Sequence, residues 1–310
     1  MLYNGGESVM GKKTISIIGV PSDYGQARRG VDMGPSAIRY AGVIERLEKI
    51  GHKVQDQGDI RVSKKINNVE IDERLLNLEE VVDVSTSLAN RVHEAVSEKK
   101  FPLILGGDHS IAIGTLAGLS EHYKNLGVIW FDAHADLNTP ETTPSGNIHG
   151  MPLAVSMGIG HERLVQIRNH TQKIKAENII IIGARSVDPG ERKLIREQGI
   201  KVYTMHEIDR LGMTRVMEDA LAYIKAISVD GLHLSLDLDA LDPIYTPGVG
   251  TPVSGGMTYR ESHLAMEMLQ ESGMLTSAEF VEVNPILDEK NKTADLAVEL
   301  IGSLFGETLV

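Results

Sequence analysis

Cysteine is absent from this sequence of 310 residues. Without a thiol, the chain forms no disulfide framework, no thiolate zinc site and no cysteine nucleophile. Long apolar runs are absent as well: residues 127–131 and 179–182 form runs of about five residues, whereas a membrane-spanning helix needs roughly 20. The amino terminus also lacks the apolar stretch of a signal peptide. We therefore expect a soluble, cytoplasmic protein without a membrane partner.

Positive charge is scarce. The chain has 31 Lys and Arg residues against 43 Asp and Glu residues, and its formal net charge is -12. No run of Lys or Arg exceeds two residues, so the clustered positive charge that binds a phosphate backbone is missing and nucleic acid is not an expected partner. The acidic surplus attracts a cationic substrate or divalent metal ions to a carboxylate-lined cleft, but it equally serves solubility alone.

Linkers, internal repeats and low-complexity tracts are absent too. Hydrophobic residues make up 42% of the chain, which is enough to build a core and far from the composition of a disordered protein. We predict a single domain over residues 14–310, preceded by a flexible tail at residues 1–13.

Short apolar segments alternate with longer segments of helical period along the chain. This alternation is typical of an α/β fold in which helices cover both faces of a mostly parallel sheet. Most of the short segments are continuously apolar, as expected for strands that are buried on both faces. Strands are predicted at residues 14–20, 101–105, 127–131, 178–183, 201–204, 231–238 and 278–283.

Helices are predicted where apolar residues recur at near-helical spacing, at residues 75–96 and 208–224. A further helix is predicted to begin after Thr258, where Thr-Tyr-Arg-Glu forms a capping box, and to end before Gly273. The last helix is predicted at residues 293–304.

Three motifs follow predicted strands, at the sheet edge where ligand-binding groups collect in α/β folds. The first is Gly-Gly-Asp-His-Ser at residues 106–110. Alone it is a weak signal, because Asp108 and Ser110 can cap the following helix while His109 makes a local hydrogen bond. Metal ligation by His109 is the alternative interpretation.

The second motif places Asp132, His134 and Asp136 at alternate positions after the strand at residues 127–131. In extended chain such side chains share one side, so three groups of the metal-ligand type converge. A solvated strand end is the other interpretation, but it does not require a buried strand with Trp and Phe to run directly into it. Metal binding is favoured.

The third motif, His-Leu-Ser-Leu-Asp-Leu-Asp-Ala-Leu-Asp-Pro, puts Asp237 and Asp239 on the same side of a strand. Burial of two carboxylates without a cation is costly or raises their pKa values sharply, so a bound cation is favoured. Asp242, which precedes Pro243, is expected to shape a turn, and His233 to be a hydrogen-bonded core residue.

Together the motifs supply four carboxylates and two imidazoles, more ligands than one octahedral ion needs if positions stay open for water and substrate. Two metal ions that share bridging carboxylates fit this number. Oxygen and imidazole ligands without sulfur suit Mn²⁺, with Fe²⁺, Co²⁺ and Zn²⁺ as alternatives. Two such ions roughly 3.5–4 Å apart activate a bridging water, which makes hydrolysis the leading reaction class.

The same motifs, Gly-Gly-Asp-His-Ser, Asp-Ala-His-Ala-Asp and Asp-Leu-Asp-Ala-Leu-Asp-Pro, resemble the metal signatures of the ureohydrolase family. The resemblance extends over nearly the whole chain, from residues 30–39 to residues 281–285. Within the family, the segment at residues 138–150 resembles the bacterial, Bacillus-type arginases. The resemblance adds a roughly eight-stranded sheet to the predicted α/β fold, which is a three-layer α/β/α, arginase/deacetylase-like arrangement.

The resemblance also implies a cofactor of two Mn²⁺ ions per subunit. The implied ligands are His109 and Asp136 for one ion, His134 and Asp239 for the other, and Asp132 and Asp237 for both. It further implies that a metal-bridging hydroxide attacks the guanidinium carbon of L-arginine and gives L-ornithine and urea, which is the arginase step of arginine metabolism and the urea cycle.

The remaining site residues are implied in the same way. His149 relays protons, Glu282 faces the guanidinium group, and Asp136 is counted with them as a catalytic residue. A histidine has a pKa suited to proton transfer, although a lone loop histidine often has no such role. Residues implied to bind the substrate or line its pocket are Asn138, Thr143, Ser145, Asn147, Asp188, Glu191 and Thr251.

Two other functions stay open. An agmatinase, or another guanidino or amidine hydrolase of the family, shares all six metal ligands, and residues 143–147 are the segment that discriminates it. A non-catalytic, metal-binding regulatory homologue is disfavoured because ligands, proton relay and substrate loop occur together. The family also implies a homo-oligomer, a trimer or a hexamer.

Overall fold

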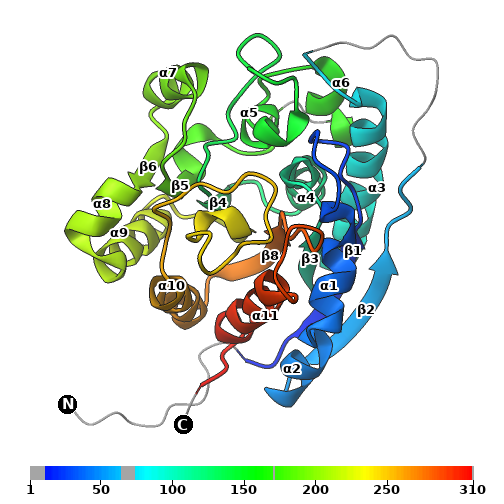
Figure 1. Ribbon diagram of the computed structural model, residues 1–310, viewed down its shortest axis with the longest axis vertical. Coiled ribbons are helices and arrows are strands. Elements are labelled where there is room, and N and C mark those ends of the chain that lie inside the picture. Colours follow the sequence, from blue (N-terminus) through cyan, green and yellow to red (C-terminus); the bar gives the residue numbers. More distant parts are fainter. Residues whose placement is uncertain (1–10, 64–73, 170–171, 309–310) are drawn as a thin grey trace.

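Eight strands form one sheet in the computed structural model of the protein, which describes residues 11–63, 74–169 and 172–308 (Figure 1). The strand order is β2-β1-β3-β8-β7-β4-β5-β6, and every neighbouring pair is parallel. The strands are β1 (Thr14–Val20), β2 (Lys53–Asp59), β3 (Phe101–Gly106), β4 (Leu126–Phe131), β5 (Ile179–Ala184), β6 (Lys201–Thr204), β7 (Gly231–Asp237) and β8 (Leu275–Val281).

Side chains along the strands alternate between two apolar cores. In β5, Ile180 and Ile182 belong to one core, and Ile179 and Ile181 belong to the other, and all four are fully buried. β-branched side chains of this kind pack well on a pleated surface that is covered on both sides. The continuous apolar segments of the sequence therefore become strands that are buried on both faces.

Helices cover both faces of the sheet, which confirms the predicted three-layer fold. One layer consists of α1 (Gly34–Tyr40), α2 (Val43–Lys49), α8 (Met205–Leu211), α9 (Met213–Ala226), α10 (Tyr259–Ser272) and α11 (Lys292–Leu304). The other consists of α3 (Leu78–Ser97), α4 (Ala112–Leu119), α5 (Pro152–Ser156), α6 (Glu162–Val165) and α7 (Pro189–Gln198). Figure 1 shows α10 and α11 on one side of the sheet and α3, α4 and α5 on the other.

The capping box predicted for α10 is present. Thr258 Oγ1 accepts a hydrogen bond from Glu261 N at 3.3 Å, and Glu261 Oε2 accepts one from Thr258 N at 2.8 Å. Gly273, with a φ of 65°, ends the helix in the left-handed conformation that glycine favours.

The predicted elements leave out helices α1, α2, α5, α6 and α7, and two further differences concern β2 and the helix predicted at residues 208–224. β2 is not among the predicted strands because its sequence is polar and it lies half-exposed at the edge of the sheet. It forms nevertheless, since parallel pairing with β1 satisfies its backbone along one side. The helix predicted at residues 208–224 is two helices, α8 and α9, because Gly212 has a φ of 78° and separates them.

Residues 11–13 are the described part of the predicted tail. Residues 1–10 lie outside the described residues, but Lys13 N donates a hydrogen bond to His52 Nδ1 at 3.1 Å, and Lys13 Nζ donates one to the carbonyl of Leu275 at 2.9 Å. In the part of the chain that the structure describes, no helix combines the length and the apolar character needed to span a membrane.

Candidate metal centre

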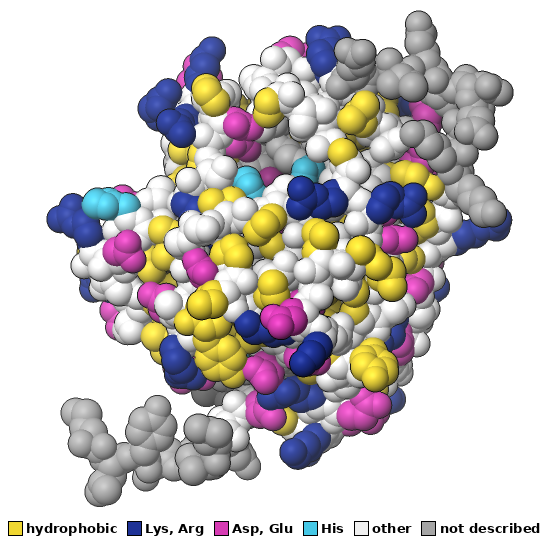
Figure 2. All heavy atoms as spheres, in the orientation of Figure 1, with side chains coloured by type: hydrophobic (Ala, Val, Ile, Leu, Met, Phe, Trp, Pro, Cys, Tyr) yellow, Lys and Arg dark blue, Asp and Glu magenta, His cyan; other side chains and the backbone are white. Residues whose placement is uncertain are grey.

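The carboxyl ends of the central strands β3, β8, β7 and β4 meet at one edge of the sheet. His109 follows β3, Glu282 follows β8, Asp237 ends β7, and Asp132 follows β4. Parallel strands thus bring together residues that are far apart in the sequence. In Figure 2, histidine and acidic side chains gather around a hollow in the upper part of the face that is shown.

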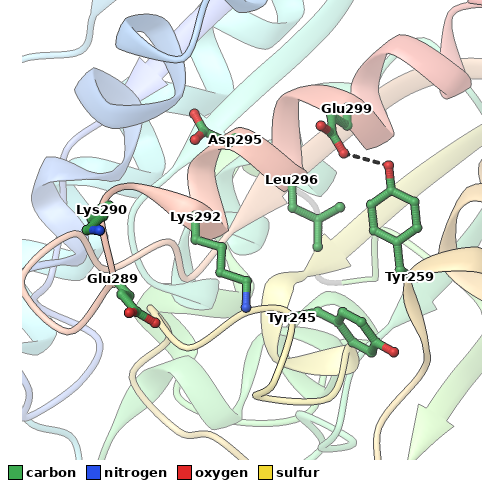
Figure 3. Close-up of a pocket in the computed structure, with 8 residues that line it drawn as sticks. All are labelled: Tyr245, Tyr259, Glu289, Lys290, Lys292, Asp295, Leu296 and Glu299. Carbon is green, nitrogen blue, oxygen red and sulfur yellow. Dashed lines mark hydrogen bonds between the residues drawn. The ribbon is translucent and has the colours of Figure 1, made fainter.

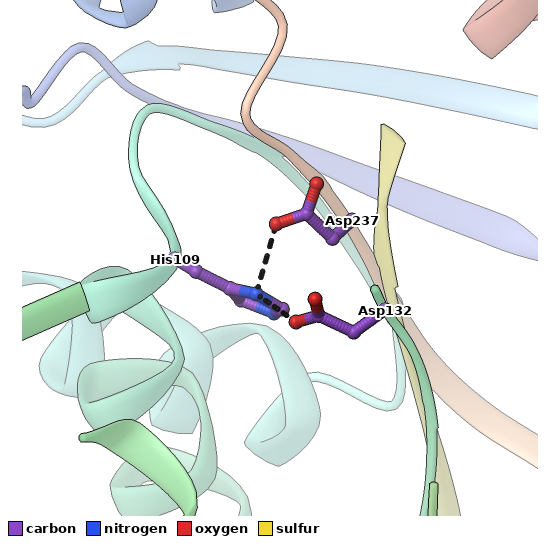
Figure 4. A group of neighbouring side chains, drawn as sticks. All are labelled: His109, Asp132 and Asp237. Carbon is purple, nitrogen blue, oxygen red and sulfur yellow. Dashed lines mark ion pairs between the residues drawn. The ribbon is translucent and has the colours of Figure 1, made fainter. Parts of the chain in front are cut away.

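His109 is the centre of a first group of ligand-type side chains. It begins the short 3-10 helix η2 (His109–Ile111), and its Nδ1 lies 3.1 Å from Asp132 Oδ2 and 3.3 Å from Asp237 Oδ2 (Figure 4). Asp136 Oδ2 is 3.0 Å from the same nitrogen. The ligand atoms of His109, Asp132 and Asp237 are close enough to hold one metal ion.

Asp132 also belongs to a second group. Its Oδ1 lies 3.3 Å from His134 Nδ1, which is 3.1 Å from Asp239 Oδ2. The ligand atoms of Asp132, His134 and Asp239 are again close enough to hold one ion. Asp132 therefore offers one oxygen to each group, as a carboxylate that bridges two ions does.

Backbone geometry orients these carboxylates. Asp237 Oδ1 accepts a hydrogen bond from Asp239 N at 2.7 Å, and Asp239 Oδ1 accepts one from Ala133 N at 3.1 Å. Each carboxylate thus has one oxygen held and the other directed at a histidine. Asp136 has a φ of 52°, a left-handed conformation that costs a non-glycine residue about 1–2 kcal/mol. This conformation turns Asp136 toward His109.

The cluster attracts positive charge strongly. Burial lowers the pKa of His134, but Asp239 and Asp132 raise it further, to about 12. Burial and the charge of Asp132 raise the pKa of Asp136 to about 6. Burial and neighbouring carboxylates also raise the pKa values of Asp237 and Asp239. The raised pKa values show that these buried carboxylates repel one another when charged. A divalent cation relieves this repulsion, so the carboxylates form a suitable set of metal ligands.

The ring of His109 gives independent support for this fit. Its Nδ1 is buried and has no hydrogen-bond partner of suitable geometry among the described residues. Its Nε2 lies 2.8 Å from Ser235 Oγ, which donates to Glu279 Oε1 at 2.7 Å. The Trp130 ring stacks on His109 at 4.0 Å and donates Nε1–H to Asp132 Oδ2 at 3.0 Å. These contacts fix the imidazole so that Nδ1 is directed at the carboxylates, as a metal ligand requires.

His149 and Glu282, the predicted proton relay and guanidinium-facing residue, form an ion pair beside these groups. His149, in the 3-10 helix η3 (Ile148–Gly150), has its Nδ1 3.2 Å from Glu282 Oε1, and the same oxygen accepts a hydrogen bond from His109 N at 3.0 Å. Burial lowers the pKa of His149, but Glu282 raises it further, to about 9. Burial raises the pKa of Glu282, and the two histidines lower it below its ordinary value.

The predicted substrate loop forms a turn near the centre. Thr143 Oγ1 accepts a hydrogen bond from Gly146 N at 3.0 Å, and Ser145 Oγ accepts one from Asn147 N at 3.3 Å. Asn138 is buried, and its Oδ1 accepts a hydrogen bond from Thr142 Oγ1 at 3.0 Å. Asn147 Oδ1 is buried without a hydrogen-bond partner among the described residues. The hydroxyl groups therefore stabilise the turn, and their contact with a substrate stays a prediction.

Asp188 and Glu191 connect this loop to α7. Asn138 Nδ2 donates a hydrogen bond to Asp188 Oδ2 at 2.9 Å. Glu191 accepts one from Asp188 N at 2.7 Å and one from Leu137 N at 3.0 Å, so both of its oxygens are used by backbone groups. Thr251 Oγ1 donates to Asp239 Oδ2 at 3.0 Å and thus lies at the second ligand group.

Three polar residues of the motifs have structural roles, as the sequence indicates. His233 is fully buried, with Nδ1 2.9 Å from Ser277 Oγ. Asp242 accepts hydrogen bonds from Ile244 N in its own turn and from Gly255 N and Gly256 N in the loop before α10. Asp108 accepts one from Ser110 N at 2.9 Å and caps η2. The capping role of Asp108 is therefore compatible with a position of His109 beside the carboxylates.

Sequence patterns do not reveal the contribution of the loop at residues 21–29, which follows β1. Gln26 Nε2 donates a hydrogen bond to Glu282 Oε2 at 2.9 Å, and Gly25 O accepts one from His149 N at 2.9 Å. A glutamine in a loop carries no signal of its own. Only the topology of the sheet brings β1 and this loop to the same edge as β8.

A separate cavity of about 400 Å³ lies between α11, the start of α10 and the loop at residue 245 (Figure 3). Tyr259 OH donates a hydrogen bond to Glu299 Oε2 at 2.7 Å at one side of it. Its lining includes no histidine and none of the predicted site residues: Tyr245, Tyr259, Glu289, Lys290, Lys292, Asp295, Leu296 and Glu299. It is therefore not part of the metal centre.

Comparisons with known proteins agree with this geometry. Residues 13–306 match the Arginase family. The arginase of Bacillus subtilis strain 168 is 67% identical over 299 residues, which cover 96% of this chain and 99% of that protein. The solved structure of the arginase from Bacillus caldovelox has a TM-score of 0.94 at 65% identity and covers 96% and 100% of the two chains. The structure of Entamoeba histolytica arginase in complex with L-ornithine has a TM-score of 0.89 at 36% identity, with the same coverage.

Proposed function

The chain belongs to the arginase family, and on this basis we propose that it is an arginase-type hydrolase that cleaves the guanidinium group of L-arginine to give L-ornithine and urea. The observation that carries the proposal is the pair of His–Asp groups that share Asp132 at the carboxyl edge of the sheet. The names of the Bacillus relatives at 67% and 65% identity, both arginases, support the same reaction.

Two Mn²⁺ ions per subunit are part of the proposal. The residues that hold them are His109 and Asp136 for one ion, His134 and Asp239 for the other, and Asp132 and Asp237 for both. Carboxylate and imidazole donors without sulfur support Mn²⁺. When bound, the two ions supply an activated water as the nucleophile for the guanidinium carbon.

Glu282 and His149 act on the reacting end of the substrate. Glu282 is 1% exposed, and a buried carboxylate in such a place is stabilised by a guanidinium group. His149 is hydrogen-bonded to Glu282 through Nδ1, and 17% of its side chain is exposed, so it can exchange a proton between solvent and the leaving amine.

The other end of the substrate is held by the loop at residues 138–147 and by Asp188. Neutral hydroxyl and amide donors from Asn138, Thr143, Ser145 and Asn147 suit the α-carboxylate, and the carboxylate of Asp188 suits the α-amino group. Glu191 supports this loop by accepting a hydrogen bond from Leu137 N, and Thr251 supports the second ligand group by donating one to Asp239. We further propose one catalytic domain over residues 14–310 and a cytoplasmic homo-oligomer, a trimer or a hexamer, whose size light scattering measures.

Urea release with arginine and with agmatine tests the substrate. Agmatine lacks the α-carboxylate, so the Mn²⁺-loaded protein is expected to prefer arginine. Asn147→Ala is expected to raise the KM for arginine about tenfold, as the loss of about one hydrogen bond to a charged group does, and to leave kcat/KM for agmatine unchanged. A preference of the wild type for agmatine contradicts the arginase activity but not the metal centre.

A non-catalytic regulatory protein is the alternative from another class. Metal content by elemental analysis, measured on the sample used for the urea assay, separates it from an enzyme. A protein that holds two metal equivalents and binds arginine without release of urea contradicts the proposed hydrolysis.

A further inference from the structure

Gln26 is buried beside the metal centre, with 6% of its surface exposed. Its Nε2 donates a hydrogen bond to Glu282 Oε2 at 2.9 Å. The other oxygen of Glu282, Oε1, accepts from His109 N at 3.0 Å and lies 3.2 Å from His149 Nδ1. The two oxygens of Glu282 therefore have different neighbours, and among the described residues Gln26 alone donates a hydrogen bond to Oε2.

The loop that bears Gln26 is held on both sides of it. Gly25 N donates to Asp108 Oδ2 at 3.0 Å, and Gly25 O accepts from His149 N at 2.9 Å. Arg28 Nη1 donates to the carbonyl of Gly250 at 2.7 Å. Gln26 thus keeps its position without help from a bound substrate.

Gly250 leaves just enough space for this contact. A Cβ at position 250 would lie 2.6 Å from Gln26 Oε1 and 3.3 Å from Glu282 Oε2. The backbone at Gly250 therefore packs directly on the pair, and any larger residue displaces the amide.

An amide suits this place for a chemical reason. A planar guanidinium is bound best when a carboxylate presents its oxygens in a set plane. The N–H of Gln26 holds that plane without neutralising Glu282, whereas a lysine here would compete with the substrate and a glutamate would repel Glu282. We propose that Gln26 is a positioning residue that orients the Glu282 carboxylate for the guanidinium group, an inference that rests on the proposed function.

Steady-state urea release by Gln26→Leu tests the role. Loss of the orienting N–H lets the guanidinium bind in a less reactive orientation, so kcat for arginine is expected to fall about 10–100-fold, as small misplacements of reacting groups do. KM is expected to change less than about threefold, because the contacts to the amino-acid end of arginine remain. Metal content is expected to stay at the wild-type value.

Gln166→Leu is the matched control. Gln166 Nε2 donates to Glu162 Oε1 at 2.8 Å at an exposed site, so the same glutamine–glutamate hydrogen bond is removed away from the centre. Its kcat, KM and metal content are expected to equal those of the wild type. Gly250→Ala, whose methyl group meets Gln26 Oε1, is expected to reproduce the fall in kcat, and it decides the question if Gln26→Leu does not fold.

Wild-type kcat in Gln26→Leu and Gly250→Ala overturns the positioning role while leaving the proposed function intact. A rise in KM without a fall in kcat, or loss of bound metal, also overturns it, because Gln26 would then serve binding or the metal centre. No urea from arginine with the wild-type enzyme overturns the proposed function and this inference with it.

Discussion

The carboxylates of the metal centre are held by hydrogen bonds in orientations that direct their oxygens at the two histidines. Asp132 has Oδ2 3.1 Å from His109 Nδ1 and Oδ1 3.3 Å from His134 Nδ1. Asp237 has Oδ1 hydrogen-bonded to Asp239 N at 2.7 Å, and its Oδ2 is 3.3 Å from His109 Nδ1. Such fixed carboxylates can bind ions with little loss of conformational freedom on binding.

Asp237→Ala is expected to remove bound metal together with activity. The substitution takes away one ligand oxygen and leaves the remaining buried charges less well matched to two ions. We expect metal content to fall from two equivalents to one or fewer and urea release to fall at least about 1,000-fold, since loss of the activated water removes the nucleophile. Elemental analysis and a urea assay of one sample measure both.

Asp230→Ala is the control at the other end of the same strand. Asp230 precedes β7 and accepts hydrogen bonds from Lys124 N and Asn125 N at 2.9 Å each, away from the carboxyl edge. Two metal equivalents and wild-type activity are expected. Full activity of Asp237→Ala would show that Asp237 is not a metal bridge.

At the residue scale, the metal-ligand residues can be predicted from the sequence, because residues with ligand-type side chains occur at the spacing that puts them on one side of the chain. Asp132, His134 and Asp136 alternate after an apolar strand, and this pattern alone favours a metal site. The contacts of Gln26 and Ser235 at the metal centre cannot be predicted in this way. Their contacts join residues that are distant in the sequence, and neither residue type is distinctive by itself.

At the element scale, Arg185 connects the carboxyl ends of β5 and β7 through hydrogen bonds. Its guanidinium donates hydrogen bonds to the carbonyls of Gly183, Asp239, Ala240, Leu241 and Val253. The residues from Asp239 to Leu241 follow β7, and Val253 lies in the loop that carries Thr251. One side chain after β5 thus positions the segment that contains a predicted metal ligand.

Arg185→Lys is expected to loosen that segment. A lysine has three donors on one nitrogen and cannot reach five carbonyls in the fork geometry of a guanidinium. We expect metal affinity to fall about 10–100-fold, as when partners that orient metal ligands are removed. Metal retained after dialysis against a graded chelator series measures this.

Arg215→Lys is the control for this change. Arg215 lies on α9 and pairs with Asp219 on the same exposed helix face. Unchanged metal retention is expected there. Equal retention in Arg185→Lys and the wild type would contradict the positioning role of Arg185.

Lys13 crosses the amino edge of the sheet, where its ammonium lies 4.5 Å from the centre of the Phe101 ring at β3 and donates to Leu275 O at β8. Burial lowers the pKa of Lys13 to about 8, from 10.5 in the unfolded chain. Between these values the unfolded chain binds a proton that the folded chain does not, so stability rises with pH. Wild-type stability relative to Lys13→Met is therefore expected to increase from pH 8 to pH 10.5.

Urea-induced unfolding of both proteins over this pH range measures the difference. The comparison cancels the titration of tyrosines and other lysines that the two proteins share. A constant difference from pH 8 to pH 10.5 contradicts the lowered pKa.

At the element scale, strands buried on both faces were predictable because each is a continuous apolar run, as in β4 and β5. β2 was not, because only one of its edges is paired and its residues are polar. The break between α8 and α9 was also missed, since Gly212 interrupts an apolar pattern that continues across it. The apolar pattern of a sequence indicates which residues are buried, but it does not show every point at which the backbone changes direction.

Across the whole molecule, metal binding is expected to be linked to folding. The centre joins residues that follow β3, β4 and β7, so ions that bind it stabilise only the folded chain. Ligand at 100 times its Kd stabilises a protein by about 2.7 kcal/mol per site. Chelator is expected to lower the midpoint of thermal unfolding, and added Mn²⁺ to restore it.

Elemental analysis before and after chelation is the necessary companion measurement. Asp237→Ala is expected to show a smaller shift of the midpoint on chelation, because it binds less metal. Removal of both ions from the wild type without any change in the midpoint contradicts the linkage.

The sequence by itself determined the chemistry of this protein: the six ligand-type residues, the alternation of strands and helices, and the resemblance to a family of hydrolases. These are local properties, since spacing along a strand and the apolar period of a helix depend on neighbours in the chain. They suffice for the residue types of a metal centre and for the layers of the fold.

Only the tertiary structure decided which side chains meet. The strand order places β3, β8, β7 and β4 side by side, so His109, Glu282, Asp237 and Asp132 converge at one edge. It also brings the loop after β1 to Glu282 and gives Gln26 a role that its position in the sequence does not suggest. Contacts between distant segments depend on how the strands are ordered, and that order follows from the packing of the whole chain.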